Sequence, residues 1–307
     1  MNEKVSVLQV DNLSVSFSMY NKGLSKRDLE VIHELSIDVK KGEIVAVVGS
    51  SGSGKSLLAH AIMGILPENS KTKGIIKYYN DELNEKYLRK VRGKDIAFIP
   101  QSVDFLDPLM KVGKQVVGIN GNKERQKEVF KKYNLDDKVA EMYPFQLSGG
   151  MARRVLIATA VMNEAKLIIA DEPTPGLNLE LAMETLNNFR EIADSGCGVL
   201  LITHDVDLAL NVADRIAVFY SGTIVEIAQV EDFIKGKDAL RHPYSKAFID
   251  ALPQNKFKEL PGYQPYAGNL PKGCLFRDRC SLKTDECCME IKMRKVRDGE
   301  VRCINAT

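Results

Sequence analysis

Apolar residues along this chain repeat with two different periods, which predict strands and helices in alternation. The run Ile44–Val48 is apolar without interruption, as expected for a central strand of a parallel sheet that is covered on both faces. After Lys55, apolar residues recur with helical spacing as far as Leu66, and Pro67 follows the predicted helix end. A second short apolar run, Leu167–Ala170, predicts another buried strand.

On a coarser scale, the pattern divides the chain into successive parts. The predicted order is strand-rich sequence at 5–48 and 74–101, mainly helical sequence at 102–163, and alternating strand and helix at 164–230. A hairpin with Ser221-Gly222 at its turn is expected near the end of the last part. We therefore expect an α/β domain over 1–235 with a helical subdomain at about 102–163, and a separate extension over 236–307.

A glycine-rich sequence, GSSGSGKS at 49–56, joins the first predicted strand to the first predicted helix. It fits the phosphate-loop pattern, in which glycines let backbone N–H groups surround a polyphosphate at a helix N-terminus. Lys55 is expected to reach the β- and γ-phosphates, and the Ser56 hydroxyl to bind Mg²⁺. The nucleotide-binding residues predicted from this loop are Gly49, Ser50, Ser51, Gly52, Ser53, Gly54, Lys55, Ser56 and Leu57.

An acidic pair follows the second apolar run. Asp171 stands at the predicted carboxyl end of that strand and is expected to hold Mg²⁺. Glu172 comes next, and we expect it to polarise the attacking water as the catalytic base. An acidic pair that merely opens a loop is the structural alternative.

The sequence LSGGM at 147–151 precedes another helical run. Ser148 is a good N-cap residue, and Gly149 and Gly150 leave bare backbone N–H groups that can bind an anion such as a γ-phosphate. Taken alone, the motif is better explained as a capped helix without a ligand.

In order and spacing, these motifs resemble those of ABC-type ATPases over about residues 5–232. The resemblance implies a RecA-like core with an antiparallel β subdomain and a helical subdomain. It also implies a head-to-tail dimer that holds two ATP molecules, each between the phosphate loop of one chain and the LSGGM signature of the other.

The same resemblance assigns further roles. It implies that Phe17 stacks on adenine, with Tyr20 as a competing aromatic, that Gln101 links the metal to a membrane partner, and that His204 is the switch histidine. His204 would hold the γ-phosphate and the attacking water in line. Asn178 departs from the family pattern, because an Asp that contacts the opposite phosphate loop is typical there.

The composition of the chain argues against a membrane-spanning, a secreted and a nucleic-acid-binding protein. The sequence shows neither an apolar stretch long enough to span a membrane nor a signal peptide, so we expect any membrane role to come through partners. Residues 236–307 hold 14 Lys and Arg against nine Asp and Glu, whereas the rest of the chain is weakly acidic. This imbalance is too small for a nucleic-acid footprint and favours a solvated surface.

The extension also holds five of the six cysteines. Their spacing is looser than that of typical zinc sites, although zinc and free thiols both remain alternatives. RHPYSKAFIDALP at 241–253 and GCLFRDRC at 273–280 resemble the C-terminal extension of ATPases in oligopeptide, dipeptide and nickel importers. Some of those ATPases hold a 4Fe–4S cluster, which implies Cys274, Cys280, Cys287 and Cys303 as ligands, with Cys288 as a substitute for Cys287. Cys197 is expected to be a small core residue.

The leading functional hypothesis is an ATPase subunit, at the cytoplasmic face of the cell membrane, that powers uptake of peptides or of a metal or metal chelate. The resemblance implies a second ABC ATPase chain as heterodimer partner, two membrane permease subunits and an extracellular or periplasmic binding protein. The alternative is a soluble ABC ATPase acting on ribosomes or nucleic acid. Such proteins tend to carry two cassettes, coiled-coil insertions or basic arms, and none is visible in this sequence.

Overall fold

The computed structural model describes residues 5–20, 25–50, 52–118, 121–252, 255 and 258–307, whose strands form two sheets. The larger sheet has eight strands. In spatial order they are β11 (Arg294–Val296), β12 (Gly299–Val301), β10 (Thr223–Gln229), β9 (Arg215–Tyr220), β3 (Ile44–Val48), β8 (Gly198–Thr203), β7 (Leu167–Asp171) and β6 (Ile96–Ile99).

The parallel part of this sheet is its buried centre. Strands β9, β3, β8, β7 and β6 pair in parallel, and every residue of β3, β7 and β8 is buried. The predicted strands Ile44–Val48 and Leu167–Ala170 are therefore confirmed, and the second extends by one residue. Strands β9 and β10 form the predicted hairpin, in which Ser221 (φ 48°) and Gly222 (φ 89°) both adopt the positive φ that a tight two-residue turn requires.

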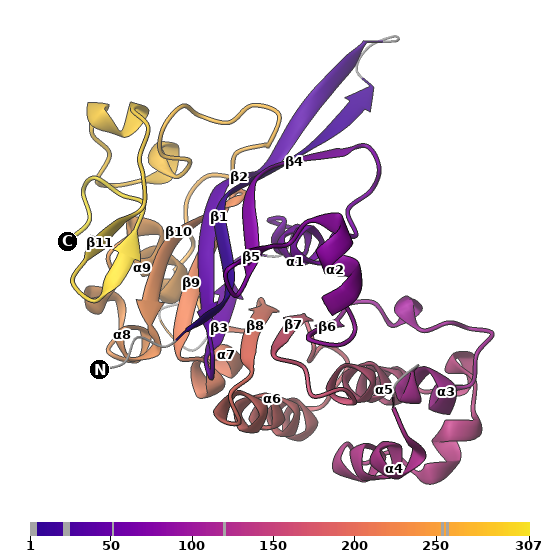
Figure 1. The fold of residues 1–307 in the computed structure, drawn as a ribbon. Coiled ribbons are helices and arrows are strands. Elements are labelled where there is room, and N and C mark those ends of the chain that lie inside the picture. The colour runs from indigo at the N-terminus through magenta and orange to yellow at the C-terminus, as the bar shows by residue number, and fades with distance from the viewer. Residues whose placement is uncertain (1–4, 21–24, 51, 119–120, 253–254, 256–257) are drawn as a thin grey trace.

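The smaller sheet is antiparallel and lies beside the first (Figure 1). Its order is β2 (Lys26–Lys40), β1 (Ser6–Tyr20), β4 (Ser70–Tyr78) and β5 (Asp81–Glu82). The pattern predicts a strand-rich segment at 74–101, yet this segment also contains α2 (Glu85–Val91). The Asn84 side chain caps this helix by accepting a hydrogen bond from the backbone N–H of Tyr87.

The other α-helices lie at the strand ends and in a lobe of their own. They are α1 (Lys55–Met63), α3 (Val112–Val117), α4 (Lys123–Lys132), α5 (Gly149–Val161), α6 (Leu179–Asp194), α7 (Val206–Val212), α8 (Val230–Ile234) and α9 (Pro243–Asp250). Figure 1 shows α3, α4 and α5 together at the lower right, as expected for the helical segment 102–163. The helix predicted after Lys55 ends at Met63, because Gly64 takes a left-handed conformation (φ 59°).

The extension is joined to the larger sheet. Strand β12 pairs with β10, so the β11–β12 hairpin continues the sheet of the cassette. Beside this junction, the buried guanidinium of Arg241 bonds to Glu226, Asp232 and the carbonyl oxygen of Val296. A Cβ on Gly299 would come within 2.6 Å of that guanidinium, so the approach requires glycine. No helix within the described ranges is long and apolar enough to cross a membrane.

Candidate nucleotide site and cysteine cluster

Four elements bring their chemical groups to one edge of the parallel sheet. The phosphate loop follows β3, Asp171 ends β7, His204 follows β8, and Gln101 comes two residues after β6. Carboxyl ends of parallel strands meet at the same edge, which is where ligands bind in open α/β sheets. Residues far apart in the sequence are therefore gathered by the register of the strands.

In the phosphate loop, the buried Lys55 ammonium is held by the loop's own carbonyl groups. Its Nζ donates to the carbonyl oxygens of Gly49 (2.9 Å) and Ser50 (3.0 Å). Burial lowers the pKa of Lys55, while the nearby carboxylates of Glu172 and Asp171 act in the opposite direction. A Cβ on Gly49 would lie 2.4 Å from the carbonyl oxygen of Phe219, so only glycine fits there.

Further members of the predicted loop keep their expected places. Gly52 (φ 74°) and Gly54 (φ 102°) adopt positive φ, and Leu57 packs against the core of the smaller sheet. The Ser53 hydroxyl is buried without a hydrogen-bond partner among the described residues. Ser51, also predicted to bind nucleotide, lies outside the described residues.

Two of the three residues predicted to bind Mg²⁺, which are Ser56, Gln101 and Asp171, contact each other. The Ser56 hydroxyl donates to Asp171 Oδ1 at 3.1 Å. Asp171 is only 1% exposed, and its Oδ2 has no partner within the described part of the chain. Burial raises the pKa of Asp171, although the Ser56 hydrogen bond and the Lys55 charge oppose this. A buried carboxylate oxygen left free beside a serine hydroxyl fits a hard cation such as Mg²⁺.

Glu172 and His204 also lie together. Glu172 Oε2 lies 2.7 Å from His204 Nδ1, and Glu172 adopts a positive φ of 48°. Its backbone N–H donates to the carbonyl oxygen of Ile202, which fixes this turn to β8. The carboxylate predicted to act as base is thus held by the histidine predicted to act as switch.

Arg153 is a site residue that the sequence motifs do not single out. Its buried guanidinium donates to the carbonyl oxygens of Pro100 (2.8 Å) and Gln101. Burial lowers the pKa of Arg153, and the carboxylates of Asp171 and Glu172 oppose this shift. Arg153 therefore ties the signature helix α5 to the loop that carries Gln101. In the sequence, the one hint that Arg153 belongs to the site is its charge directly after LSGGMA. An arginine exposed on the surface of the helix would give the same pattern.

The signature begins a helix, as predicted. Ser148 caps α5 by accepting a hydrogen bond from the Met151 N–H at 3.3 Å, and Gly149 is exposed, so that a Cβ added there would meet nothing within 4 Å. Asn178 caps α6 in the same way, accepting from the Leu181 N–H at 2.9 Å. The Asn178 side chain thus has a local structural role besides the cross-dimer contact expected of an Asp.

The two candidate adenine-stacking aromatics differ in environment. Phe17 is half-buried and packs against the core beneath the smaller sheet. Tyr20 is exposed, with the Lys26 ammonium 5.4 Å from its ring centroid. Stacking on adenine by Phe17 thus stays a prediction, with Tyr20 as its competitor.

Four of the extension's cysteines lie near one another. Burial raises the pKa of Cys274 to about 11, and the neighbouring thiols of Cys303, Cys287 and Cys280 raise it further. The pKa of Cys280 and that of Cys303 are raised mainly by burial, with a further contribution from Cys287. Cys288 is exposed. No three His, Cys, Asp or Glu side chains of the described residues are placed to hold a metal ion as they stand.

Cys197 lies elsewhere, in the main core. It is buried at 4% exposure, which confirms the core position expected for it. Burial raises the pKa of its thiol to about 12.

A segment of the extension also reaches the phosphate loop. We call residues 258–271 the strap. Gln264 Oε1 accepts a hydrogen bond from the Ser50 hydroxyl at 3.1 Å, and the carbonyl oxygen of Pro265 accepts one from Ser221 at 3.4 Å. Arg279, next to Cys280, holds the start of the strap by donating to the carbonyl oxygen of Pro261 at 2.9 Å. No motif in the sequence predicts this contact, because 214 positions separate Ser50 from Gln264.

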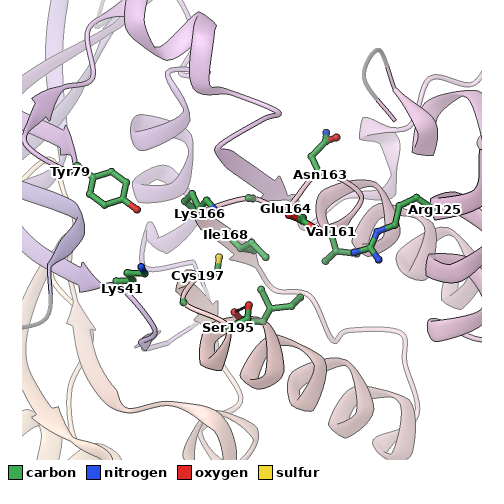
Figure 2. Close-up of a pocket in the computed structure, with 13 residues that line it drawn as sticks. Lys41, Tyr79, Arg125, Val161, Asn163, Glu164, Lys166, Ile168, Ser195 and Cys197 are labelled. Atoms are coloured by element: carbon green, nitrogen blue, oxygen red, sulfur yellow. Dashed lines mark hydrogen bonds between the residues drawn. The ribbon is translucent and has the colours of Figure 1, made fainter. Parts of the chain in front are cut away.

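A cavity of about 450 Å³, drawn in Figure 2, lies away from this chemistry. Lys166 and Cys197, which line it, directly precede β7 and β8, so it opens at the amino ends of the strands. The phosphate loop is at the opposite ends. This cavity has no part in the nucleotide site.

The fold and the site together define a P-loop ATPase cassette of the ABC type. A model of the ABC transporter family matches residues 32–175, and a model of the oligopeptide/dipeptide transporter C-terminal region matches residues 225–287. The dimeric MJ0796 cassette, a bacterial ABC transporter component, superposes with a TM-score of 0.65 at 26% identity, over 73% of this chain and 98% of that one.

Curated relatives cover nearly the whole chain. The probable D,D-dipeptide transport ATP-binding protein DdpD of Escherichia coli is 33% identical over 97% of this chain and 95% of its own length. The oligopeptide transport ATP-binding protein OppD of Bacillus subtilis is 34% identical over 90% of this chain and 81% of its own. The chain therefore belongs to the ABC transporter ATP-binding proteins, in the branch with the oligopeptide/dipeptide C-terminal region. It is an ATPase whose hydrolysis of ATP drives transport, which confirms the predicted fold class and enzyme class.

Proposed function

We propose that this chain powers the uptake of dipeptides or oligopeptides as an ATPase subunit of an ABC importer. The observation that carries the proposal is the pairing of an ABC cassette with a C-terminal region typical of oligopeptide and dipeptide transporters. The similar proteins DdpD and OppD carry dipeptide and oligopeptide transport in their names. Nickel or a metal chelate is the other cargo class expected from the sequence.

In the proposed mechanism, the phosphate loop binds the triphosphate and Lys55 moves its ammonium from the loop carbonyls toward the β- and γ-phosphates. Ser56 and the free Oδ2 of Asp171 would hold Mg²⁺, which neutralises charge on the phosphates when bound. Glu172 would orient the attacking water, and its contact with His204 (2.7 Å) would hold the two side chains together beside the γ-phosphate.

We further propose that a second ABC ATPase chain completes each nucleotide site. The exposed Ser148 and Gly149 at the N-terminus of α5 suit a phosphate presented by another chain. Asn178, which lacks the usual charge at its position, favours a partner of different sequence. A heterodimer is therefore the assembly we propose.

The helical lobe supplies a surface for the membrane partners. A groove of about 490 Å³ lies between β6 and α5, with Phe98, Phe105 and Leu156 in its walls. In the same helical segment, Leu109 is 87% exposed and Phe145 is 75% exposed. Exposed apolar side chains of this kind typify interaction sites. We propose that one of the two permease subunits binds here and holds the chain at the cytoplasmic face of the membrane, with an extracellular or periplasmic protein delivering the cargo.

Co-purification tests this assembly. The tagged chain would be isolated gently from native membranes, and everything that accompanies it identified by mass spectrometry. Two polytopic membrane proteins and a second ATPase are the expected companions. Recovery with ribosomes or nucleic acid instead would contradict the importer and favour the soluble alternative. Reconstituted transport of labelled dipeptide, compared with Ni²⁺ as competing cargo, then decides the cargo class.

A second proposal concerns the cysteines: we propose that Cys274, Cys280, Cys287 and Cys303 bind a 4Fe–4S cluster. Two features support it. The nearby thiols of Cys303, Cys287 and Cys280 raise the pKa of Cys274, and the Cys280 sulfur accepts a backbone N–H bond from Leu282 at 3.4 Å, a contact that suits a cluster thiolate. No three of these described thiols converge, so we expect the segments that carry them to rearrange when a cluster is loaded.

Iron content tests the cluster proposal. Anaerobic purification of the full chain should give a brown protein with about four irons per chain. Cys280→Ser should lose the colour, whereas Cys288→Ser, which changes the exposed neighbour of Cys287, should keep it. A colourless, iron-free wild-type protein that binds zinc or nothing would overturn the proposal.

A further inference from the structure

The extension contacts the phosphate loop at Ser50. The Ser50 hydroxyl donates to Gln264 Oε1 of the strap at 3.1 Å. On α9, burial raises the pKa of Tyr244 to about 12, and a hydrogen bond with the Ser50 hydroxyl opposes this rise. A serine hydroxyl has one donor site and two acceptor sites, so it can pair with both side chains at once. Two elements of the extension, α9 and the strap, thus meet at one position of the loop.

Ser50 also belongs to the network that holds Lys55 within the loop. The carbonyl oxygen of Ser50 accepts hydrogen bonds from Lys55 Nζ at 3.0 Å and from the backbone N–H of Ser53 at 3.4 Å. A contact that fixes the Ser50 side chain therefore restricts the backbone that holds Lys55. A binding loop that already has its bound shape loses less conformational freedom when the ligand arrives. The contact is thus placed to influence how tightly ATP binds.

The start of the strap is held by Arg279. The Arg279 guanidinium donates to the carbonyl oxygens of Leu260 (3.0 Å) and Pro261 (2.9 Å), and to the Tyr220 hydroxyl at 3.3 Å. Three N–H groups of one planar side chain therefore fix two positions of the strap to the end of β9.

The strap is held again beyond Gln264. The carbonyl oxygen of Pro265 accepts a hydrogen bond from the Ser221 hydroxyl at 3.4 Å, and that of Gly268 accepts one from the Arg27 guanidinium. In Figure 1 the loop that contains the strap reaches from the extension toward β1 and β2. Gln264 thus lies between anchors on both sides, which keep its side chain against the phosphate loop.

We propose that Gln264 and Arg279 are positioning residues for ATP binding. Gln264 holds Ser50, Arg279 holds the strap that carries Gln264, and both act through the Ser50 hydroxyl on the shape of the phosphate loop. Such coupling is reciprocal, so bound ATP also stabilises the docked strap. The proposal rests on the ATPase activity and on the phosphate loop as the ATP site, and it is independent of the cargo and of a cluster on the cysteines.

A double-mutant cycle on the full chain tests whether Arg279 acts through Ser50. Fluorescent-nucleotide titration measures ATP affinity for the wild type, Ser50→Ala, Arg279→Met and the double variant. Each single change should weaken ATP binding about two- to tenfold, the range for one neutral hydrogen bond. The double variant should bind ATP no more weakly than Ser50→Ala, because the hydroxyl that transmits the effect is already gone. Effects that multiply would show that Arg279 acts elsewhere and would overturn the proposal.

Arg277→Met is the matched control. Arg277 lies in the same short 3-10 helix, Arg277–Arg279, but its guanidinium donates at 2.7 Å to the carbonyl oxygen of Lys272, which lies outside the strap. This variant should therefore keep the wild-type ATP affinity. A second cycle, with Gln264→Ala in place of Arg279→Met, leaves the Arg279 anchor intact and should give the same non-additive result.

Two other outcomes would count against the proposal in different ways. A lower melting temperature for Arg279→Met with unchanged ATP affinity would mean that Arg279 only stabilises the extension, and it would refute the positioning role alone. A wild-type chain that bound no ATP would refute the assignment of the phosphate loop together with the positioning role.

Discussion

In the cassette, the chemical side chains stand at the ends of neighbouring parallel strands, whereas in the extension three of the four thiols stand on loops and Cys287 lies in a short 3-10 helix, Asp285–Cys288. Ser56 touches Asp171, and Glu172 touches His204. The thiols are near one another but do not converge. Strand register fixes the positions of the first set, because each strand is held on both sides by backbone hydrogen bonds. The second set lacks such a frame, because its cysteines stand outside the parallel strands.

The two regions also differ in what anchors them. The cassette is held by two apolar cores. The extension adds Tyr244, Ile249 and Phe276 to the larger core, and it is also joined through the short β12 pairing and the buried Arg241–Glu226 network. A change in that network should therefore loosen the extension more than the nucleotide site. Substitutions in the cassette and in the extension can test this difference.

Glu172→Gln should give the largest effect, on the cassette side. Removing the carboxylate base should lower the rate of ATP hydrolysis about 10²- to 10⁴-fold and leave ATP binding intact. Phosphate release and equilibrium nucleotide binding measure the two quantities separately. Glu180→Gln, on the exposed first turn of α6, is the control. Brisk turnover by Glu172→Gln would show that another group is the base.

Arg241→Met should give the next largest effect, on the extension side. It leaves the fully buried Glu226 carboxylate without its charge partner, which typically costs about 3–5 kcal/mol of stability. Denaturant unfolding measures the loss. Adding Glu226→Gln removes the unpaired charge, so the double variant should recover part of the stability. Equal unfolding curves for wild type and Arg241→Met would mean that the network does not anchor the extension.

His242→Asn should change how stability depends on pH. Burial lowers the pKa of His242 from 6.5 to about 3 in the folded chain. The unfolded chain therefore binds a proton between about pH 6.5 and 3 where the folded chain does not, and stability falls as pH falls through that window. The slope is at most about 1.4 kcal/mol per pH unit. Asparagine keeps an acceptor for the Tyr244 N–H and should remove this part of the slope. If stability depended on pH in the same way in His242→Asn, a group other than His242 would be responsible for the pH dependence.

Gln264→Ala should give the smallest effect, at the contact between the two regions. Losing its hydrogen bond with Ser50 should weaken ATP binding about two- to tenfold, the range for one neutral hydrogen bond. Fluorescent-nucleotide titration measures the affinity. Asn269→Ala is the matched control, since this exposed strap residue bonds through its backbone N–H. Unchanged affinity for Gln264→Ala would show that the strap merely rests on the phosphate loop.

Much of the cassette is predictable because its signals are local. The apolar run of β3, the glycine pattern after it and the acidic pair after β7 each lie within a few residues, so each predicts its own structure. The helix α2 was not predicted, because it lies within a segment that reads as strands. The N-cap residue Asn84 is the sequence feature that indicates where this helix begins. Arg153 and Gln264 escape prediction because their partners, Gln101 and Ser50, are distant in sequence.

The sequence by itself determined the class of protein, the phosphate loop, the acidic pair and the signature, because contiguous motifs encode them. The tertiary structure decided which distant groups meet: Glu172 with His204, β12 with β10, and the strap with the phosphate loop. The physical reason is that these contacts follow from strand register and from packing across the junction. Neither strand register nor packing across the junction produces a periodic or local signal in the sequence.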